Sequence, residues 1–294
     1  MPIDNIACQP IHETRRSSQP DMSTATAEQV VDDTVQAAEA VFGDRIEAIF
    51  TLGSLAHGGF APLVSDVDVA IILASTGPGT AQQIEQVRSL VVAKASSPLA
   101  ARLSLFWGDW SAVRSGSGDH CRLGPVDRLD LLASGRLLRG SDRREPSVRP
   151  SHRDLVLMSA EHMLGKFTDE YLEQLADADA LLADGVRAAT KAILFPVRFL
   201  YTLATGRIGL NDASARWYAA QGLPGAALAL KALEWRNDGI ANVDEAVQSL
   251  DAELLALHAE CLEQYGRDLE RIGDRGLAAA AVERNSNLRG ASRV

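Results

Sequence analysis

Residues 53–72, GSLAHGGFAPLVSDVDVAII, place two aspartates in a run that is otherwise apolar enough for a buried strand. Asp66 and Asp68 are separated by one residue, so both side chains point to the same face of a strand. Two carboxylates this close repel each other, and an unpaired buried charge is costly. A divalent cation is the usual way to stabilise such a pair. The stretch therefore predicts a divalent-metal site at Asp66 and Asp68.

The composition is that of a folded chain and argues against several classes of function. The 294 residues are 46% hydrophobic and 23% charged, which fits one large domain or two modest ones. The net charge of -10 argues against broad nucleic-acid binding. The sequence has no run of about 18 apolar residues, so we expect no membrane span. Cys8, Cys121 and Cys261 show no metal-ligand spacing and fit reduced thiols in a cytoplasmic protein.

The pattern along the chain predicts an α+β fold in two domains. Residues 27–145 mix helical and strand-like segments, and we expect an α/β domain with a mixed sheet there. Residues 150–275 show helical patterns throughout and predict an all-helical C-terminal domain. Residues 1–26 predict a disordered arm, and residues 276–294 a flexible tail. The Ser-, Gly- and Asp-rich residues 111–124 predict a loop.

Short elements of the first domain follow from local patterns. Apolar residues at helical spacing predict helices over 27–43 and 80–95. Short apolar runs predict strands within IEAIFTLGS (46–54), SDVDVAIILA (65–74) and ARLSLFW (101–107). The segment LDLLASGRLLRG (129–140) fits either a last strand or a short helix.

The spacing of two short motifs carries a family resemblance. Gly53-Ser54, then eleven residues, then Asp66-Val67-Asp68 resembles the G-S…D-x-D layout of the polymerase-β-like nucleotidyltransferase superfamily. The resemblance implies that Gly53 lets the backbone approach a triphosphate and that Ser54 binds a phosphate oxygen. It also implies that Asp66 and Asp68 hold Mg²⁺, which bridges the phosphates and the attacking oxygen.

The second half of the chain narrows this resemblance. Residues 191–220, KAILFPVRFLYTLATGRIGLNDASARWYAA, resemble the helical domain of aminoglycoside nucleotidyltransferases that adenylylate streptomycin and spectinomycin. The resemblance covers roughly residues 45–235. It implies transfer of AMP from ATP to an aminoglycoside hydroxyl. Arg198 stands on an otherwise apolar helix, and it is either a buried ion-pair partner or a contact to phosphate in the catalytic cleft.

Two departures from the family pattern affect the expected chemistry. Ser104 stands where the family has a glutamate general base, and serine cannot take a proton at neutral pH. Asp109 is the nearest substitute, and Asp127 and Asp130 are further candidates. Asn211 stands where relatives often carry a phosphate-binding lysine. The side chains that could compensate for its missing charge are Arg207 and Lys191.

Several other side chains have a structural and a functional interpretation. His57 is either a surface loop residue or a substrate contact, and Trp107 and Trp110 either pack or form a wall of the cleft. The acidic segment 167–185 is either a solvated helix face or a surface that attracts cationic aminoglycosides.

The function that we expect from the sequence is a magnesium-dependent nucleotidyltransferase that uses ATP and a small hydroxyl acceptor, without nucleic-acid or membrane partners. Asp66, Asp68 and Asp109 are the expected catalytic residues, and Gly53, Ser54 and Arg198 the expected nucleotide-binding residues. One alternative keeps the catalysis with a protein or another metabolite as acceptor. The other is a non-catalytic nucleotide sensor that has lost the base.

Overall fold

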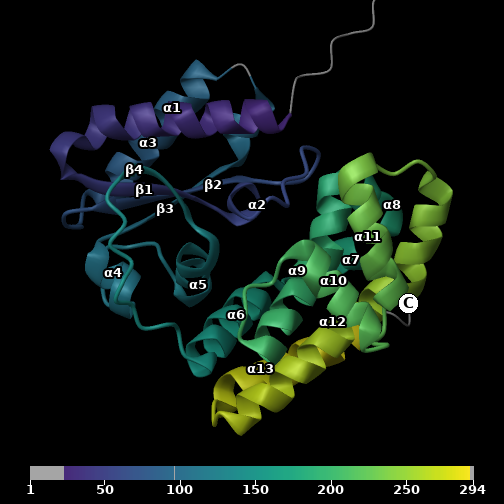
Figure 1. The fold of residues 1–294 in the computed structure, drawn as a ribbon. Helices are drawn as coiled ribbons and strands as arrows, with labels where there is room; N and C mark the ends of the chain where they lie inside the picture. Colours follow the sequence, from purple (N-terminus) through teal and green to yellow (C-terminus); the bar gives the residue numbers. More distant parts are fainter. Residues whose placement is uncertain (1–22, 96, 292–294) are drawn as a thin grey trace, which may run out of the picture.

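The computed structural model describes residues 23–95 and 97–291, which form an α+β fold (Figure 1). The predicted fold class is confirmed, because a four-stranded mixed sheet is followed by helices alone from residue 152 onward. The predicted arm, residues 1–26, lies mostly outside the described residues, and its last three residues, 24–26, belong to the first helix. No helix among the described residues is long and apolar enough to cross a membrane.

The sheet has the strand order β3-β2-β1-β4. β1 runs antiparallel to both of its neighbours, whereas β2 and β3 run parallel, as the crossover through a helix between them requires. The segment 129–140 supplies both structures that the sequence left open, a helix and then a strand. The strands are β1 (Ile46–Leu52), β2 (Val67–Leu73), β3 (Leu103–Gly108) and β4 (Arg136–Gly140).

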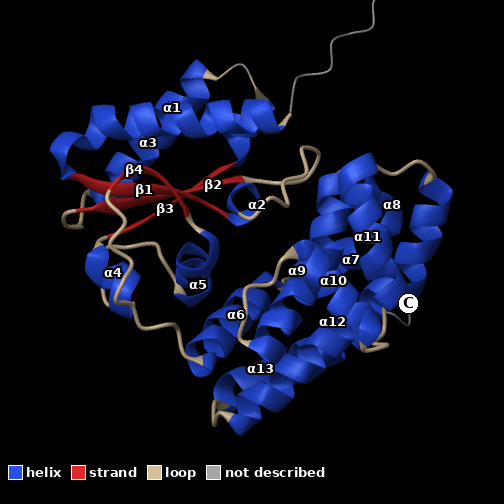
Figure 2. Cartoon of the chain, viewed as in Figure 1, coloured by secondary structure: helices blue, strands red, loops and turns tan. Residues whose placement is uncertain are grey.

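Both faces of the sheet are covered by helices (Figure 2). Along β2, Val69 and Ile71 join the core under α1 and α3, while Ala70 and Ile72 join the core on the other face, beside α4 and α5. Burial on both faces explains why β2 is apolar at nearly every position. The elements that flank the strands are α1 (Thr24–Phe42), α2 (Gly53–Ala56), α3 (Thr80–Lys94), α4 (Trp110–Ser115), α5 (Pro125–Ser134) and the 3-10 helices Gly43–Arg45 and Pro98–Arg102.

The helical part has its own hydrophobic core, which is built mainly between α9 and α12. Tyr218 and Tyr265 are completely buried there, and each hydroxyl donates a hydrogen bond to a backbone carbonyl. The helices are α6 (His152–Lys166), α7 (Asp169–Ala176), α8 (Ala178–Ala183), α9 (Val186–Thr205), α10 (Asn211–Ala220), α11 (Ala226–Asp238), α12 (Val243–Arg271) and α13 (Arg275–Ala291).

Two segments differ from the sequence interpretation. The expected loop 111–124 begins with helix α4 instead. The expected flexible tail is helical as far as Ala291, because α13 packs along α12 and buries Ala278, Ala281 and Leu288. These three apolar residues recur on one helix face, a weak pattern that the surrounding Ser, Asn and Arg residues obscure.

Leu288 tests the contribution of α13 to stability. We expect Leu288→Ala to lower the free energy of unfolding by about 2–5 kcal/mol, because the side chain is 1% exposed. Val282→Ala on the same helix is the control and should change it by less than about 0.5 kcal/mol, since Val282 is 59% exposed. Urea denaturation followed by circular dichroism measures both. Equal effects of the two substitutions would contradict the packing of α13.

Candidate active site

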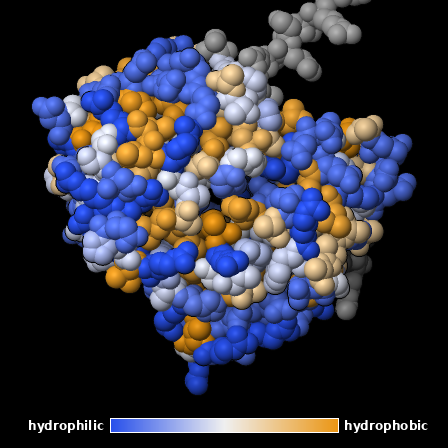
Figure 3. Space-filling model, in the orientation of Figure 1, coloured by the Kyte–Doolittle hydropathy of each residue, from blue (hydrophilic) through white to orange (hydrophobic). Residues whose placement is uncertain are grey.

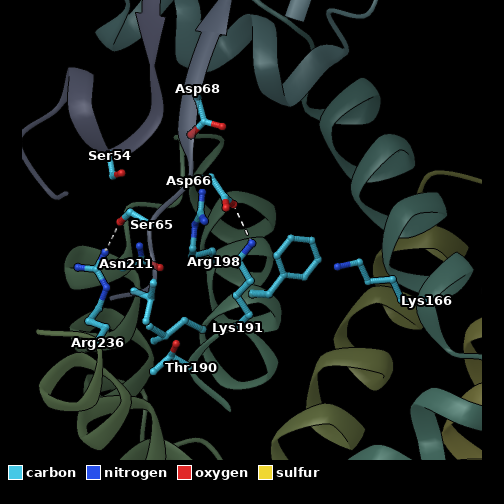
Figure 4. A pocket seen from close by; sticks show the side chains of 13 residues that line it. Ser54, Ser65, Asp66, Asp68, Lys166, Thr190, Lys191, Arg198, Asn211 and Arg236 are labelled. Carbon is cyan, nitrogen blue, oxygen red and sulfur yellow. Dashed lines mark hydrogen bonds and ion pairs between the residues drawn. The ribbon is translucent and has the colours of Figure 1, made fainter. Parts of the chain in front are cut away.

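Asp66 and Asp68 lie where β2 begins, beside the first turn of α2. Both line a small polar pocket of about 180 Å³, together with Ser54 from α2 (Figure 4). Asp66 immediately precedes the strand, and Asp68 is its second residue. The pocket is completed by side chains from α6, α9, α10 and α11, so the sheet supplies its carboxylates and the helical part supplies the rest.

Asp66 is held by two cations of α9. Its Oδ1 accepts from Arg187 Nη2 at 2.5 Å, and its Oδ2 accepts from Lys191 Nζ at 2.7 Å. Partial burial acts to raise the pKa of Asp66, but the hydrogen bonds from Lys191 and Arg187 and their charges outweigh burial, so that the pKa lies below its usual value. Asp66 is therefore ionised at neutral pH.

Asp68 has the opposite environment. Burial raises its pKa to about 7, and the nearby negative charges of Asp66 and Asp130 add to the effect. Among the described residues, no hydrogen bond or ion pair reaches the Asp68 carboxylate. The charges of Arg198 and Lys191 act in the opposite direction but do not outweigh burial, so the Asp68 carboxylate is left without a direct partner in the fold.

Gly53 is pressed against Asp68 by the turn that joins β1 to α2. Its φ of 59° is left-handed, and a Cβ at this position would collide with Asp68 Oδ2. The Gly53 N–H donates to Asp130 Oδ2 at 2.8 Å, and the other Asp130 oxygen accepts from the Ser134 hydroxyl. Asp130, a candidate base from the sequence, therefore holds the Gly53 turn in place and has both oxygens engaged.

The same pocket gathers four cationic side chains: Lys166, Lys191, Arg198 and Arg236. Arg198 donates through Nε to the carbonyl of Gly209 at 2.6 Å, and among the described residues it makes no ion pair within 4 Å. This favours the cleft-facing role of Arg198 over the buried ion pair. Arg236 donates to the carbonyl of Gly59 at 3.0 Å, which ties α11 to the loop that precedes β2.

A larger pocket of about 640 Å³ shares Asp66, Phe195 and Arg198 with the first. Ser104 lines it and lies directly opposite Asp68 in the parallel register of β2 and β3. Asp127, in the first turn of α5, also lines it. Burial raises the pKa of Asp127 to about 6, although the Gly124 N–H and the charge of Arg122 lower it.

The assignment of Asp109 as a catalytic residue requires correction. Its carboxylate accepts from the backbone N–H of Ala112 at 2.9 Å and caps α4. Because β2 and β3 are parallel and Ser104 pairs with Asp68, the residues after Gly108 lie at the opposite end of the sheet from Asp68. Asp109 is therefore a helix cap and lines neither pocket.

The remaining candidate residues either line the small pocket or lie outside both pockets. Asn211 and Lys191 line the small pocket, whereas Arg207 is exposed and lines neither. Trp107 donates through Nε1 to the carbonyl of His120 at 2.8 Å. The residues His57, Trp107 and Trp110 are absent from both linings, and so are the acidic residues Asp169, Glu170, Glu173, Asp177, Asp179 and Asp184.

Sequence reasoning missed three cations of the site, Lys166, Arg187 and Arg236. Each is on a different helix of the C-terminal part. Arg187 was detectable in principle, because it is one helical turn before Lys191 and shares its helix face. Lys166 and Arg236 have no local pattern that distinguishes them from solvated residues.

Comparisons with known proteins find similarity at the level of structure. No protein-family model and no curated protein sequence matches the chain. The solved structure of spectinomycin adenyltransferase AAD(9) from Enterococcus faecialis with ATP and spectinomycin is similar, with a TM-score of 0.52 and 14% sequence identity. The match covers 77% of this chain and 98% of that one. At this identity, the likeness shows that the chain has a nucleotidyltransferase-like fold.

The raised pKa of Asp68 predicts how stability depends on pH. Between the unfolded-state pKa of about 4 and the folded-state pKa of about 7 only the folded state keeps the proton, so stability falls over this range and is lowest above about pH 7. We therefore expect Asp68→Asn to stabilise the metal-free protein at pH 8, by on the order of 2–4 kcal/mol, and much less at pH 5. Urea denaturation in a chelator measures this, and an equal effect at both pH values would contradict it.

Proposed function

We propose that the protein is a magnesium-dependent nucleotidyltransferase that moves AMP from ATP to a hydroxyl of a small acceptor. The observation that carries the proposal is the carboxylate pair Asp66 and Asp68, packed against the Gly53 turn in a pocket whose other charged side chains are cations. Cationic side chains bind the phosphate groups of a triphosphate, and paired carboxylates bind the metal ion that accompanies it. The nucleotidyltransferase-like fold supports the same conclusion.

The residues present fit a magnesium ion that arrives with its nucleotide. Mg²⁺ is usually bound by one or two carboxylates, with substrate phosphates and waters as the remaining ligands. The described residues contain no cluster of three metal-ligating side chains, but Asp66 and Asp68 supply two. The Asp68 carboxylate is buried beside the charges of Asp66 and Asp130 and makes no ion pair among the described residues, which is consistent with a cation ligand. When bound, the ion would neutralise phosphate charge and align the reacting groups.

The protein's own residues would then bind and orient the triphosphate. Ser54 offers its hydroxyl and lies in the turn that Gly53 opens, where the backbone approaches the ligand closely. The phosphate charge would be balanced by Lys191, Arg198 and Arg236. Asn211 stands where relatives often carry a lysine, and it has no charge to contribute. Positioning and charge neutralisation are the main protein contributions to phosphoryl-type transfer.

In the transfer step, the acceptor hydroxyl oxygen forms a bond to the α-phosphorus while the bond to the pyrophosphate oxygen breaks. The hydroxyl proton needs an acceptor, and Ser104 cannot serve at neutral pH. The larger pocket has two carboxylates, Asp66 and Asp127. Asp66 is paired with Arg187 and Lys191, whereas Asp127 makes no ion pair among the described residues. With a pKa of about 6 it is largely ionised at neutral pH, so we assign the proton to Asp127.

A pyrophosphate-release assay tests the proposal. Purified protein is incubated with Mg²⁺, each labelled nucleoside triphosphate and a panel of hydroxylated acceptors that includes aminoglycosides. We expect acceptor-dependent release with ATP, and Asp68→Asn should lower it at least about a hundredfold because a metal ligand is lost. Asp109→Asn is the matched control and should leave the rate unchanged, since asparagine caps a helix as well as aspartate.

The outcomes separate the enzyme from the nucleotide sensor, which Ser104 opposite Asp68 favours. Full activity of Asp68→Asn would overturn the metal assignment. Magnesium-dependent ATP binding by calorimetry, without pyrophosphate release on any acceptor, would favour the sensor.

The role of Asp127 predicts a pH dependence. A base must be ionised, so kcat at saturating Mg²⁺, ATP and acceptor, which reports the bound complex, should rise about tenfold per pH unit below pH 6 and level off above it. Asp127→Asn should lower the plateau by about 10²-fold and remove this limb of the profile. Rates measured from pH 5 to 8 with both proteins provide the test. A profile that keeps its limb in Asp127→Asn would assign the proton elsewhere.

A further inference from the structure

The larger pocket is lined mainly by aromatic and apolar side chains. Phe195 and Phe199 lie edge to face with ring centroids 4.3 Å apart, and His162 packs against both rings. Phe106 and Met158 also contribute to the lining. In Figure 3, hydrophobic side chains gather around a hollow near the middle of the face shown. A cavity of about 640 Å³ with such walls has the size and character of a site for a small organic molecule.

The charged groups of this pocket are balanced. Its carboxylates are Asp66 and Asp127, and its cations are Arg122 and Arg198. Asp66 is bound by Arg187 and Lys191 of α9 and is the proposed magnesium ligand in the small pocket, so it does not favour a cationic acceptor in the larger one. Burial and the charge of Lys166 lower the pKa of His162, which leaves its ring neutral at pH 7.

The cleft as a whole is more positive than the protein. The chain carries a net charge of -10, yet the two pockets together are lined by five cationic side chains and three carboxylates. The cations are Lys166, Lys191, Arg122, Arg198 and Arg236. Such a lining attracts a triphosphate and repels a ligand that carries several ammonium groups. The acidic segment on α7 and α8 lies outside both linings and does not alter this balance.

We propose that the acceptor is an uncharged molecule with an aromatic or similarly apolar ring system and at least one hydroxyl, and that it is not an aminoglycoside polycation. This inference rests on the proposed function and names the acceptor class of the same site. The ring would pack against Phe195 and Phe199. The hydroxyl would donate to Asp127, and Arg122, which lies over the Phe106 ring at 5.2 Å, would bind a second polar group.

Ligand binding tests the inference without catalysis. The neutral probes are phenyl and 2-naphthyl β-D-glucopyranoside, with methyl β-D-glucopyranoside as the match that lacks the ring. Spectinomycin and streptomycin represent the cationic class. Calorimetry and saturation-transfer NMR should show the aryl glucosides binding at least about tenfold more tightly than the methyl glucoside. They should also bind more tightly than either antibiotic.

Two variants of α9 locate the site. Phe199→Leu keeps an apolar side chain but removes the ring, and it should weaken aryl glucoside binding about tenfold. Tyr201→Leu is the matched control, because Tyr201 packs edge to face against Trp217, with ring centroids 5.7 Å apart, and lines neither pocket. Circular dichroism checks that both variants fold, and equal binding by the two would place the ligand elsewhere.

The outcomes distinguish this inference from the proposed function. Tighter binding of spectinomycin or streptomycin than of the aryl glucosides would overturn the inference, and so would absence of aryl glucoside binding at millimolar concentration. Aryl glucoside binding that Phe199→Leu weakens supports it, even when the protein fails to bind ATP with Mg²⁺. In that last case the proposed function fails while the assignment of the pocket stands.

Discussion

The site depends on the ion pairs that Asp66 makes with Arg187 and Lys191. They join the first residue before β2 to α9, which is the central helix of the C-terminal part. A carboxylate at this position needs a partner, and the chain supplies two, from 121 and 125 residues further on. The same contact forms the wall between the two pockets, since Asp66 lines both. The partners of this one charge therefore lie at the centre of the cleft, which the Arg236 contact to Gly59 also closes.

Asp66 and Asp68 are the same type of residue, but their different surroundings shift their pKa values in opposite directions. Asp66 has its charge balanced within the fold, whereas Asp68 is enclosed by Gly53 and by other carboxylates, and its pKa rises to about 7. Each environment follows from the backbone. Gly53 can approach Asp68 only because it lacks a Cβ, and Asp130 holds that turn through the Gly53 N–H. The burial of an unpaired carboxylate is thus built into the structure.

Sequence reasoning located the centre of the candidate site and missed its periphery, for reasons of distance along the chain. Gly53, Ser54, Asp66 and Asp68 lie within sixteen residues, and strand alternation with a turn is enough to bring them together. The position of Ser104 beside Asp68 was also predictable, because parallel strands that follow one another along the chain commonly pair. Asp109 was chosen because it is close to Ser104 in sequence, and this choice failed. The residues between them extend along β3, so Asp109 lies beyond the far end of the strand, where its carboxylate caps α4.

The charge of the cleft could not have been predicted from composition. A chain with ten more acidic than basic residues suggests an attraction for cations, and the acidic segment on α7 and α8 strengthens that expectation. The fold separates the charges instead, because the cations of α6, α9 and α11 turn toward the sheet, while the acids of α7 and α8 lie outside the pockets. Fields inside a cleft with low-dielectric walls depend on the lining more than on the total charge. An organic ligand of this cleft is therefore expected to be anionic or uncharged, and the metal ion that reaches Asp68 arrives with an anionic nucleotide.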